Sequence, residues 1–248
     1  MSAPADTVAD PASDATALDT SRPGDQTPSG APALQARQLY RFFRAGDEET
    51  LALRGVSLEI RSGELLAVVG PSGSGKSTLL GCLAGLDEPD GGSVWLSGRR
   101  LSHRPEAERA RMRADRLGVL LQSGNLIGHL TVRGNVRLGQ SFARGRRQSV
   151  ARIIEDMGLT GRSSAYPSQL SGGEATRAGL AVALANDPAV LLADEPTGEV
   201  DGETEQMLLQ LLKDRARAGG AVVVVTHSTA VIALADRVVE LHDGRILP

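Results

Sequence analysis

A glycine-rich run that ends in a lysine is the strongest chemical pattern in this chain of 248 residues. It follows the apolar residues 65–69 and matches the pattern G-x-x-x-x-G-K-[ST]. Successive backbone N–H groups of such a loop curl around a polyphosphate, and the following helix adds the positive end of its dipole. We expect Lys76 to reach the β- and γ-phosphates and the Ser77 hydroxyl to ligate Mg²⁺. The residues assigned to phosphate binding are Gly70, Pro71, Ser72, Gly73, Ser74, Gly75, Lys76, Ser77 and Thr78.

The lysine content singles out the same position. The chain has 25 arginines and only two lysines, Lys76 and Lys213. An ammonium is a compact point charge that suits a narrow glycine loop, whereas a guanidinium is a flat, wider fork. A chain that otherwise uses arginine for positive charge therefore has a chemical reason for Lys76. The alternative, a glycine-rich turn with an incidental lysine, is disfavoured.

Two carboxylates follow a second apolar run. Residues 190–193 are Val-Leu-Leu-Ala, and Asp194 and Glu195 come next. A buried strand that delivers an acid beside a phosphate loop is an arrangement that holds Mg²⁺, so Asp194 is the expected metal carboxylate. Glu195 points elsewhere and is expected to polarise a water aimed at the γ-phosphate. His227 follows a third apolar run, and such strand ends border the ligand crevice of open α/β sheets.

The elements that must position these residues alternate along the chain. Short apolar runs are separated by segments with helical spacing, which predicts a mostly parallel sheet covered on both faces. We expect strands at 51–60, 64–69, 91–96, 190–193 and 222–225, with a closing hairpin at 238–241 and 246. We expect helices at 76–85, 104–116, 149–157, 174–185 and 203–218.

Composition excludes several classes of protein. The single cysteine, Cys82, cannot form an internal disulfide, and no apolar run approaches the roughly 20 residues of a membrane span. The start has no basic region followed by an apolar stretch, so no signal peptide is expected. A formal net charge of −3 argues against non-specific binding of nucleic acid. Residues 1–33 are acidic and rich in proline and alanine, which predicts a disordered tail.

A second glycine motif, Leu170-Ser171-Gly172-Gly173-Glu174, connects these observations. On its own it is an ordinary helix start, with a serine N-cap and a glutamate in the first turn. Its setting adds the phosphate loop, Gln122, the run at 192–198, Asp201 and His227, all in this order. With that combination the chain resembles the ATP-binding cassette (ABC) ATPase family over about residues 34–248.

The resemblance implies a role for each matching residue. Ser171, Gly172, Gly173 and Glu174 resemble the signature loop, which caps the γ-phosphate of an ATP held by a partner subunit. Gln122 resembles the Q-loop residue that touches Mg²⁺ and water, and Asp201 resembles the D-loop acid. His227 resembles the switch histidine that orients the γ-phosphate, and Phe43 is expected to stack on adenine, with Tyr40 as the alternative. The catalytic set is then Glu195, His227, Lys76 and Gln122, and the metal set is Ser77, Gln122 and Asp194.

The resemblance also implies an architecture and partners. The expected fold is α/β, a P-loop NTPase with a RecA-like core, a small antiparallel β subdomain and a helical insertion at about 100–172. Such a subunit binds ATP and Mg²⁺, dimerises with a second copy, and drives a separate transmembrane permease from the cytoplasmic face of the membrane. Gly198, residues 167–169 and residues 117–119 are most similar to the lipoprotein-release, macrolide-export and cell-division group. The apolar segment 123–136 is the expected contact with the permease.

Several positions depart from the family pattern and keep two alternatives open. Glu174 stands where the signature usually ends in Gln, and Glu199, Val200 and Ser228 also depart from the usual residues. An ATP-gated clamp with little turnover is one alternative. The other is an ATPase acting on nucleic acid, but the segment between the two glycine motifs lacks the sustained heptads of a long coiled coil. The arginine-rich segment 99–116 has no interleaved aromatic residue, so we interpret it as a solvated helix face.

Overall fold

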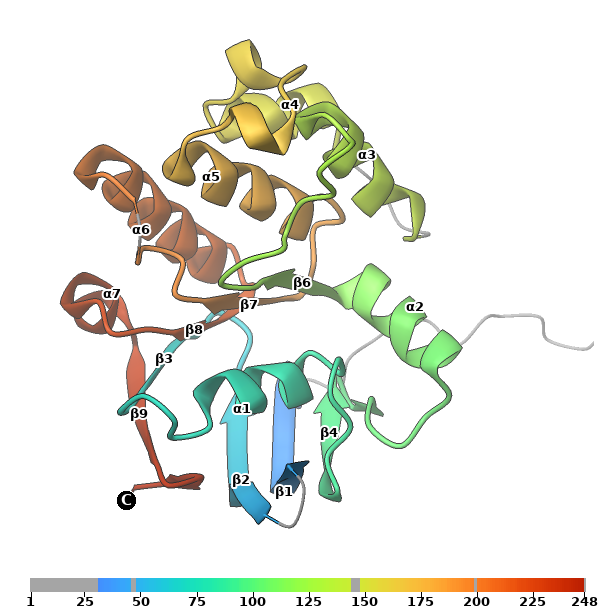
Figure 1. Ribbon diagram of the computed structural model, residues 1–248, viewed down its shortest axis with the longest axis vertical. Helices are drawn as coiled ribbons and strands as arrows, with labels where there is room; N and C mark the ends of the chain where they lie inside the picture. Colours follow the sequence, from blue (N-terminus) through green and yellow to red (C-terminus); the bar gives the residue numbers. More distant parts are fainter. Residues whose placement is uncertain (1–30, 46–47, 144–147, 199, 248) are drawn as a thin grey trace, which may run out of the picture.

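The computed structural model describes residues 31–45, 48–143, 148–198 and 200–247. Most of the predicted disordered tail, residues 1–33, lies outside the described residues, and so does Glu199. The described chain forms a parallel sheet, a smaller antiparallel sheet and helices on both faces of the parallel sheet (Figure 1).

The larger sheet has six strands in the order β10-β9-β3-β8-β7-β6. Its neighbouring strands are parallel except for the antiparallel pair β9–β10. β3, β7 and β8 are buried along almost their whole length, and this is why their sequences are continuous apolar runs rather than alternating ones. The strands are β3 (Leu65–Val69), β6 (Leu117–Leu120), β7 (Val190–Asp194), β8 (Ala221–Val225), β9 (Arg237–His242) and β10 (Arg245–Ile246).

The smaller sheet is antiparallel and has the order β2-β1-β4-β5. Its strands are β1 (Leu34–Ala45), β2 (Glu48–Ile60), β4 (Gly91–Leu96) and β5 (Arg99–Arg100). Helix α1 (Lys76–Leu83) lies between the two sheets, in contact with β1 and β2 on one side and with β7 and β8 on the other. Leu79, Leu80 and Leu83 of this helix belong to the hydrophobic core that joins the sheets. The helix that begins with Lys76 is therefore held from both sides.

A second hydrophobic core lies on the opposite face of the larger sheet, under the remaining helices except α2. These helices are α3 (Val132–Ser141), α4 (Val150–Asp156), α5 (Gly172–Ala183), α6 (Gly202–Arg217) and α7 (Thr229–Leu234), with short 3-10 turns η1 (Thr160–Arg162) and η2 (Pro167–Gln169). Each of the five α-helices begins after a Ser, Thr or Asp whose side chain accepts a backbone N–H, which fixes where the helix starts. In the described residues, no helix is both long and apolar enough to cross a lipid bilayer.

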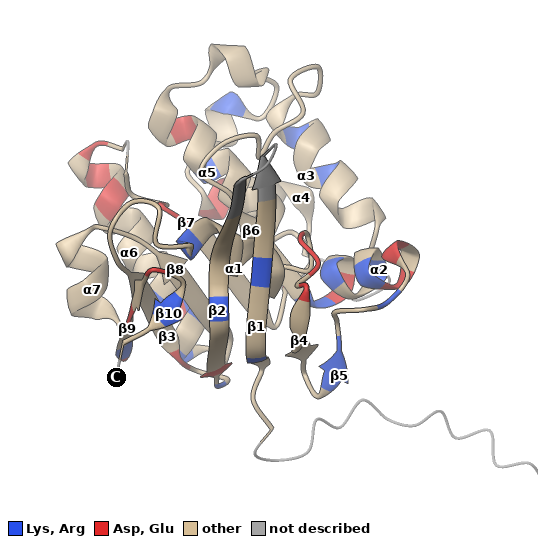
Figure 2. Ribbon diagram, turned by 60° about the horizontal axis from the view of Figure 1, so that its bottom comes forward, with Lys and Arg blue, Asp and Glu red and all other residues tan. Residues whose placement is uncertain are grey.

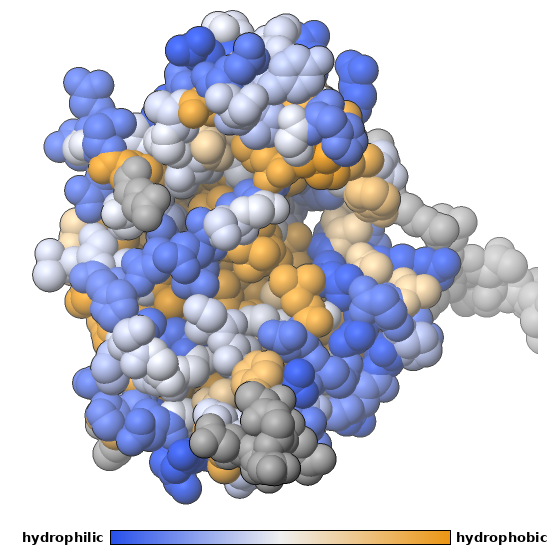
Figure 3. All heavy atoms as spheres, viewed as in Figure 1, coloured by the Kyte–Doolittle hydropathy of each residue, from blue (hydrophilic) through white to orange (hydrophobic). Residues whose placement is uncertain are grey.

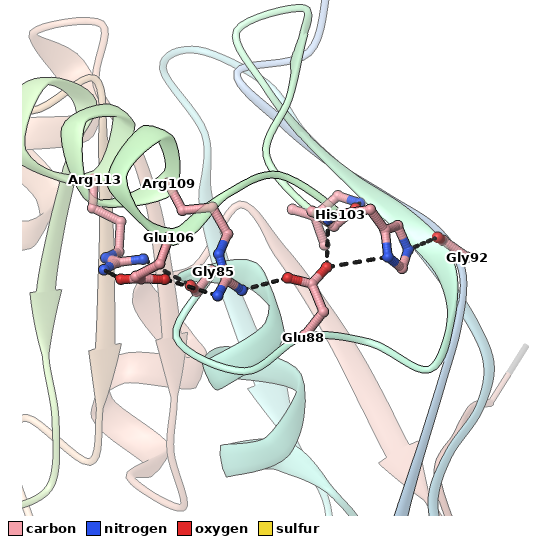
Figure 4. A network of polar contacts seen from close by, with 9 residues as sticks. Gly85, Glu88, Gly92, His103, Glu106, Arg109 and Arg113 are labelled. Carbon is pink, nitrogen blue, oxygen red and sulfur yellow. Dashed lines mark hydrogen bonds and ion pairs between the residues drawn. The ribbon is translucent and has the colours of Figure 1, made fainter.

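Helix α2 (Glu106–Arg116) is fastened to the turn after α1 by a polar network (Figure 4). Arg113 donates to the carbonyl oxygen of Gly85 over 2.8 Å, and Glu88 lies between Arg109 and His103. Basic and acidic residues share the surface of this helix (Figure 2), with internal pairs such as Arg109–Glu106 at 2.8 Å. The arginines of α2 are thus largely balanced by carboxylates, in agreement with a solvated helix face.

The predicted α/β fold with an antiparallel portion is confirmed, and so is the closing hairpin β9–β10. The structure also contains elements that were not predicted, namely the strands β1, β5 and β6, the helices α3 and α7, and the two 3-10 turns. β6 lies inside the proposed helical insertion at about 100–172, yet it pairs with β7 in the central sheet. This strand has four residues, and Gly118 within it lets α5 approach, because a Cβ there would overlap the carbonyl oxygen of Ala183. Helices α3 and α4 pack on each other and on α5, in the helical part above the larger sheet (Figure 1).

Candidate functional site

The glycine-rich loop 70–75 connects β3 to α1, as predicted, and two of its glycines are required by close contacts. Gly70 has φ +145°, and a Cβ there would overlap the carbonyl oxygen of Leu241. Gly75 has φ +101°, and a Cβ there would overlap the carbonyl oxygen of Ala52. The loop therefore takes a shape that only glycine permits at these positions.

The β9–β10 hairpin supports this loop from outside. The N–H of Gly244 donates to the carbonyl oxygen of Ser74 over 3.0 Å, and the carbonyl oxygen of Gly244 accepts from the backbone N–H of Arg54 over 2.8 Å. One turn of the hairpin thus joins the phosphate loop to strand β2. The sequence predicted the hairpin, but nothing in it indicated this contact.

Lys76 is buried and points back along the loop. Its ammonium donates to the carbonyl oxygens of Gly70 and Pro71 over 2.8 and 2.9 Å, and its side chain makes no ion pair within the described residues. The hydroxyl oxygen of Ser74 is buried without a hydrogen-bond partner in the same loop. A buried cation that donates only to carbonyl oxygens, beside an unpartnered hydroxyl and a glycine cradle, fits a polyphosphate.

Asp194 ends β7 beside the start of α1. Its Oδ2 accepts from the Ser77 hydroxyl over 3.1 Å. Burial raises the pKa of the Asp194 carboxyl, and the neighbouring Glu195 adds to this, while the Ser77 hydroxyl and Lys76 oppose it. The described residues contain no cluster of three or more His, Cys, Asp or Glu that could hold a metal. A hydroxyl and one carboxylate instead suit Mg²⁺, which keeps several waters and takes further oxygens from phosphate.

Glu195 is held in a strained conformation directly after Asp194. Its φ is +46°, a left-handed value that a residue other than glycine adopts at an energetic cost. Its Oε2 accepts from the Thr226 hydroxyl over 3.2 Å and from the backbone N–H of His227 over 3.3 Å. The Nε2 of His227 lies 3.7 Å from Oε1 of Glu195. The end of β8 thus holds the carboxylate of Glu195 in place, and Thr226 is a contributor that sequence reasoning missed.

These residues line one groove of about 500 Å³. The predicted residues that line it are Phe43, Ser72, Gly73, Gly75, Lys76, Ser77, Thr78, Gln122, Asp194, Glu195 and His227. Phe43 is 43% exposed, and the Arg41 guanidinium lies 4.9 Å from the centre of its ring. Tyr40, the alternative aromatic, packs against Gly91 and Gly55 and does not line the groove. The groove therefore presents a phosphate loop, two carboxylates and an aromatic ring to one ligand.

The signature-loop residues lie elsewhere in the same chain. Ser171, Gly172, Gly173 and Glu174 are absent from the lining of the phosphate groove. Gly172 borders a second cavity of about 340 Å³, which shares Gln122, Asp194 and Glu195 with the phosphate groove. Asp201 caps α6, where its carboxylate accepts from the N–H and the hydroxyl of Thr204 over 2.8 and 2.9 Å. Within one chain the predicted signature loop thus lies beside the phosphate groove and does not line it.

A family model for the ABC transporter matches residues 53–198, more than half of the chain. The chain belongs to the ABC transporter family. The macrolide export ATP-binding/permease protein MacB of Burkholderia pseudomallei is 40% identical over 220 residues, which are 87% of this chain and 34% of that protein. This ABC chain therefore spans about a third of the length of the macrolide export proteins it matches. These relatives confirm the predicted similarity to the macrolide-export group.

Other ABC proteins match almost over their full length. An uncharacterized ABC transporter ATP-binding protein of Methanocaldococcus jannaschii is 38% identical over 218 residues, 86% of this chain and 97% of that protein. The dimeric structure of a bacterial ABC transporter cassette has a TM-score of 0.81 and 35% identity, and the match covers 87% of this chain and 97% of that one. A dimeric post-hydrolysis state of the same cassette, bound to ADP and Pi, has a TM-score of 0.82 and 34% identity. The fold is that of an ABC ATPase cassette.

The hairpin contact predicts that a residue outside the phosphate loop controls ATP binding. Gly244 has φ +72°, and a Cβ there would lie 2.6 Å from the carbonyl oxygen of Ala52. We expect Gly244→Ala to displace the hairpin and to weaken ATP binding about tenfold, measured by titration calorimetry. Gly98→Ala is the matched control, because Gly98 has φ +75° and open space around it. Equal ATP affinities in the two variants would contradict a supporting role for the hairpin.

Proposed function

We propose that this chain is the ATP-binding and ATP-hydrolysing subunit of a transporter. Two copies of the chain close around two Mg-ATP. This closure drives a separate transmembrane permease of the export or mechanotransmission type. The observation that supports this proposal best is that Ser171 and the rest of the signature loop do not line the phosphate groove of their own chain. The groove binds a triphosphate on one side and leaves the other side open. A signature loop from a second copy would complete the enclosure, so ATP would hold two copies together.

The residues of the groove divide the work of hydrolysis between them. Lys76 would neutralise charge on the β- and γ-phosphates, because its ammonium donates only to backbone carbonyl oxygens in this structure. Ser77 and Asp194, with Gln122, would hold Mg²⁺, which neutralises phosphate charge when bound. Glu195 would accept a proton from the attacking water, while Thr226 and the N–H of His227 keep its carboxylate in position. The His227 ring and the hydroxyl of Ser171 from the second copy would orient the γ-phosphate.

ATP turnover measured on the purified chain tests the enzymatic part of this proposal. Turnover that rises in the presence of the copurifying membrane protein is the expected result. Binding of ATP without turnover would point to the clamp alternative. Retention of nucleic acid instead of a membrane protein would overturn the assignment to transport. In this proposal the chain sits on the cytoplasmic face of the membrane, where the permease holds it.

The chain that follows β6 is the proposed contact with the permease. Leu121 is 37% exposed and Ile127 is 40% exposed, and Leu121 and Leu126 line the second cavity. Seen from the side of Figure 1, hydrophobic residues are visible in the middle of the surface, between the helical part and the antiparallel sheet (Figure 3). An exposed apolar segment beside a cavity suits a helix from a partner protein.

Charge placed in this segment should separate partner binding from catalysis. We expect Ile127→Glu to keep the ATP turnover of the isolated chain and to lose copurification with the permease, because a desolvated carboxylate opposes an apolar contact. Leu86→Glu is the control, since Leu86 is 48% exposed on the turn after α1. Pull-down of the membrane protein and ATP turnover are measured for both variants. Normal copurification of the Ile127 variant would show that the permease contacts another part of the chain.

A further inference from the structure

The carboxylate of Glu174 is fully engaged inside its own chain. Its Oε2 accepts from the backbone N–H of Ser171 over 2.9 Å, and the Ser171 hydroxyl oxygen accepts from the N–H of Glu174 over 3.2 Å. This reciprocal pair is a capping box at the start of α5. Its Oε1 accepts from Nε of Arg162 over 2.8 Å. Within its own chain the two oxygens of Glu174 thus accept from Ser171 and Arg162, and its predicted contact with nucleotide stays a prediction.

The capping box determines what Ser171 can still offer to a phosphate. The N–H of Ser171 is used by Glu174, and the Ser171 hydroxyl oxygen is an acceptor within the box. A serine hydroxyl keeps its hydrogen as a donor when its oxygen accepts a bond. Ser171 can therefore donate one hydrogen bond outward, from a position directly beside a carboxylate.

That carboxylate stays ionised at neutral pH. The hydrogen bond from the Ser171 N–H and the Arg162 guanidinium hold the pKa of the Glu174 carboxyl below its usual range. A negative charge one hydrogen bond away from Ser171 repels the phosphates of an incoming nucleotide. A fixed cation beside this carboxylate would weaken that repulsion.

Arg162 supplies this cation from a separate element. It ends η1, between α4 and η2, and Ala165 N–H donates to its carbonyl oxygen over 2.9 Å. Its side chain is 53% exposed, whereas that of Glu174 is 17% exposed. The guanidinium thus covers the carboxylate from the solvent side and makes the pair neutral as a unit.

We propose that Arg162 is a positioning residue for the signature loop: by pairing with Glu174 it cancels the charge beside Ser171 and allows the loop to cap the triphosphate held by a second copy. This role rests on the proposed function, because it requires two copies to close around ATP. The Arg162–Glu174 ion pair has no net charge, so it has the same net charge as an uncharged residue at position 174 would have.

ATP-dependent dimerisation tests the role directly. The parent is Glu195→Gln, which slows turnover so that the ATP-bound dimer accumulates, and sedimentation velocity gives the ATP concentration at half-dimerisation. In this background Arg162→Gln should raise that concentration about tenfold, because the carboxylate stays in its capping box without its hydrogen-bonded cation and keeps only the Coulombic attraction of Arg177. Adding Glu174→Gln should return it to within about twofold of the parent. Raising the salt to about 0.5 M should shrink the defect of Arg162→Gln, since the repulsion is electrostatic.

Arg152→Gln is the matched control. Arg152 is 64% exposed on α4 and pairs with Asp156 at 3.0 Å, away from the signature loop. Its dimerisation should equal that of the parent, and the melting temperatures of the monomers report folding. An unchanged midpoint for Arg162→Gln would overturn the proposal. A defect that Glu174→Gln does not relieve would assign Arg162 to structure alone. If the parent itself does not dimerise with ATP, the proposed function fails first, and the Arg162 role fails with it.

Discussion

Glu195→Gln should abolish ATP turnover and leave ATP binding intact. An amide cannot accept the proton of the attacking water, so we expect the rate to fall by about 100-fold or more. The amide oxygen can still accept from Thr226 and from the N–H of His227, which lie 3.2 and 3.3 Å from Oε2 in the native chain. The fold of the groove is therefore preserved. Phosphate release and calorimetric binding of ATP measure the two effects separately.

The same variant should accumulate as a dimer in ATP and remain monomeric in ADP. Glu155→Gln is a suitable control, because Glu155 lies on the surface of α4, paired with Arg152. Its turnover and its oligomeric state should equal those of the native chain. Full turnover by Glu195→Gln would exclude Glu195 as the group that activates water.

Lys76→Arg should disable the site although it keeps the positive charge. The Lys76 side chain is 8% exposed, and its ammonium lies 2.8 and 2.9 Å from two carbonyl oxygens of its own loop. A planar guanidinium is larger and cannot occupy this position without widening the loop. We expect the affinity for ATP to fall about 100-fold, which corresponds to about 2.7 kcal/mol. Titration calorimetry with ATP measures it.

Lys213→Arg is the control within the same chain, because Lys213 is its other lysine and lies on α6, outside the groove. It should bind ATP like the native chain. Near-normal binding and turnover by Lys76→Arg would show that the loop needs only a positive charge, and that the scarcity of lysine carries no information about the site.

Sequence reasoning located the core of the groove because its chemistry is local. The phosphate loop, Asp194 and His227 each stand next to a buried apolar strand, and parallel strands bring their carboxyl ends to one edge of a sheet. The position of Phe43 was harder to predict, because apolar and polar residues alternate only weakly along β1 and the strand has register shifts against β2. The groove lining nevertheless includes Phe43 and not Tyr40.

The parts that were missed depend on contacts between distant segments. β6 has only four residues, one of them glycine, and its identity as a strand comes from pairing with β7. The partner of Glu174 is Arg162, on a turn whose position depends on how α4 and η2 pack. Neither periodicity nor motif spacing carries such information. In this chain, sequence reasoning therefore misses contacts between distant segments when one of them has a weak propensity for helix or strand.

The hairpin contact also has a consequence for how the protein is made. Strand β3 and the phosphate loop leave the ribosome about 170 residues before Leu241 and Gly244, which shape and support that loop. Contacts between residues so distant in sequence form late, because a long loop must close first. Until the hairpin arrives, the glycine loop lacks its outer wall. A growing chain that has exposed Lys76 but not the hairpin should therefore bind nucleotide more weakly, and ATP would assist its early folding less.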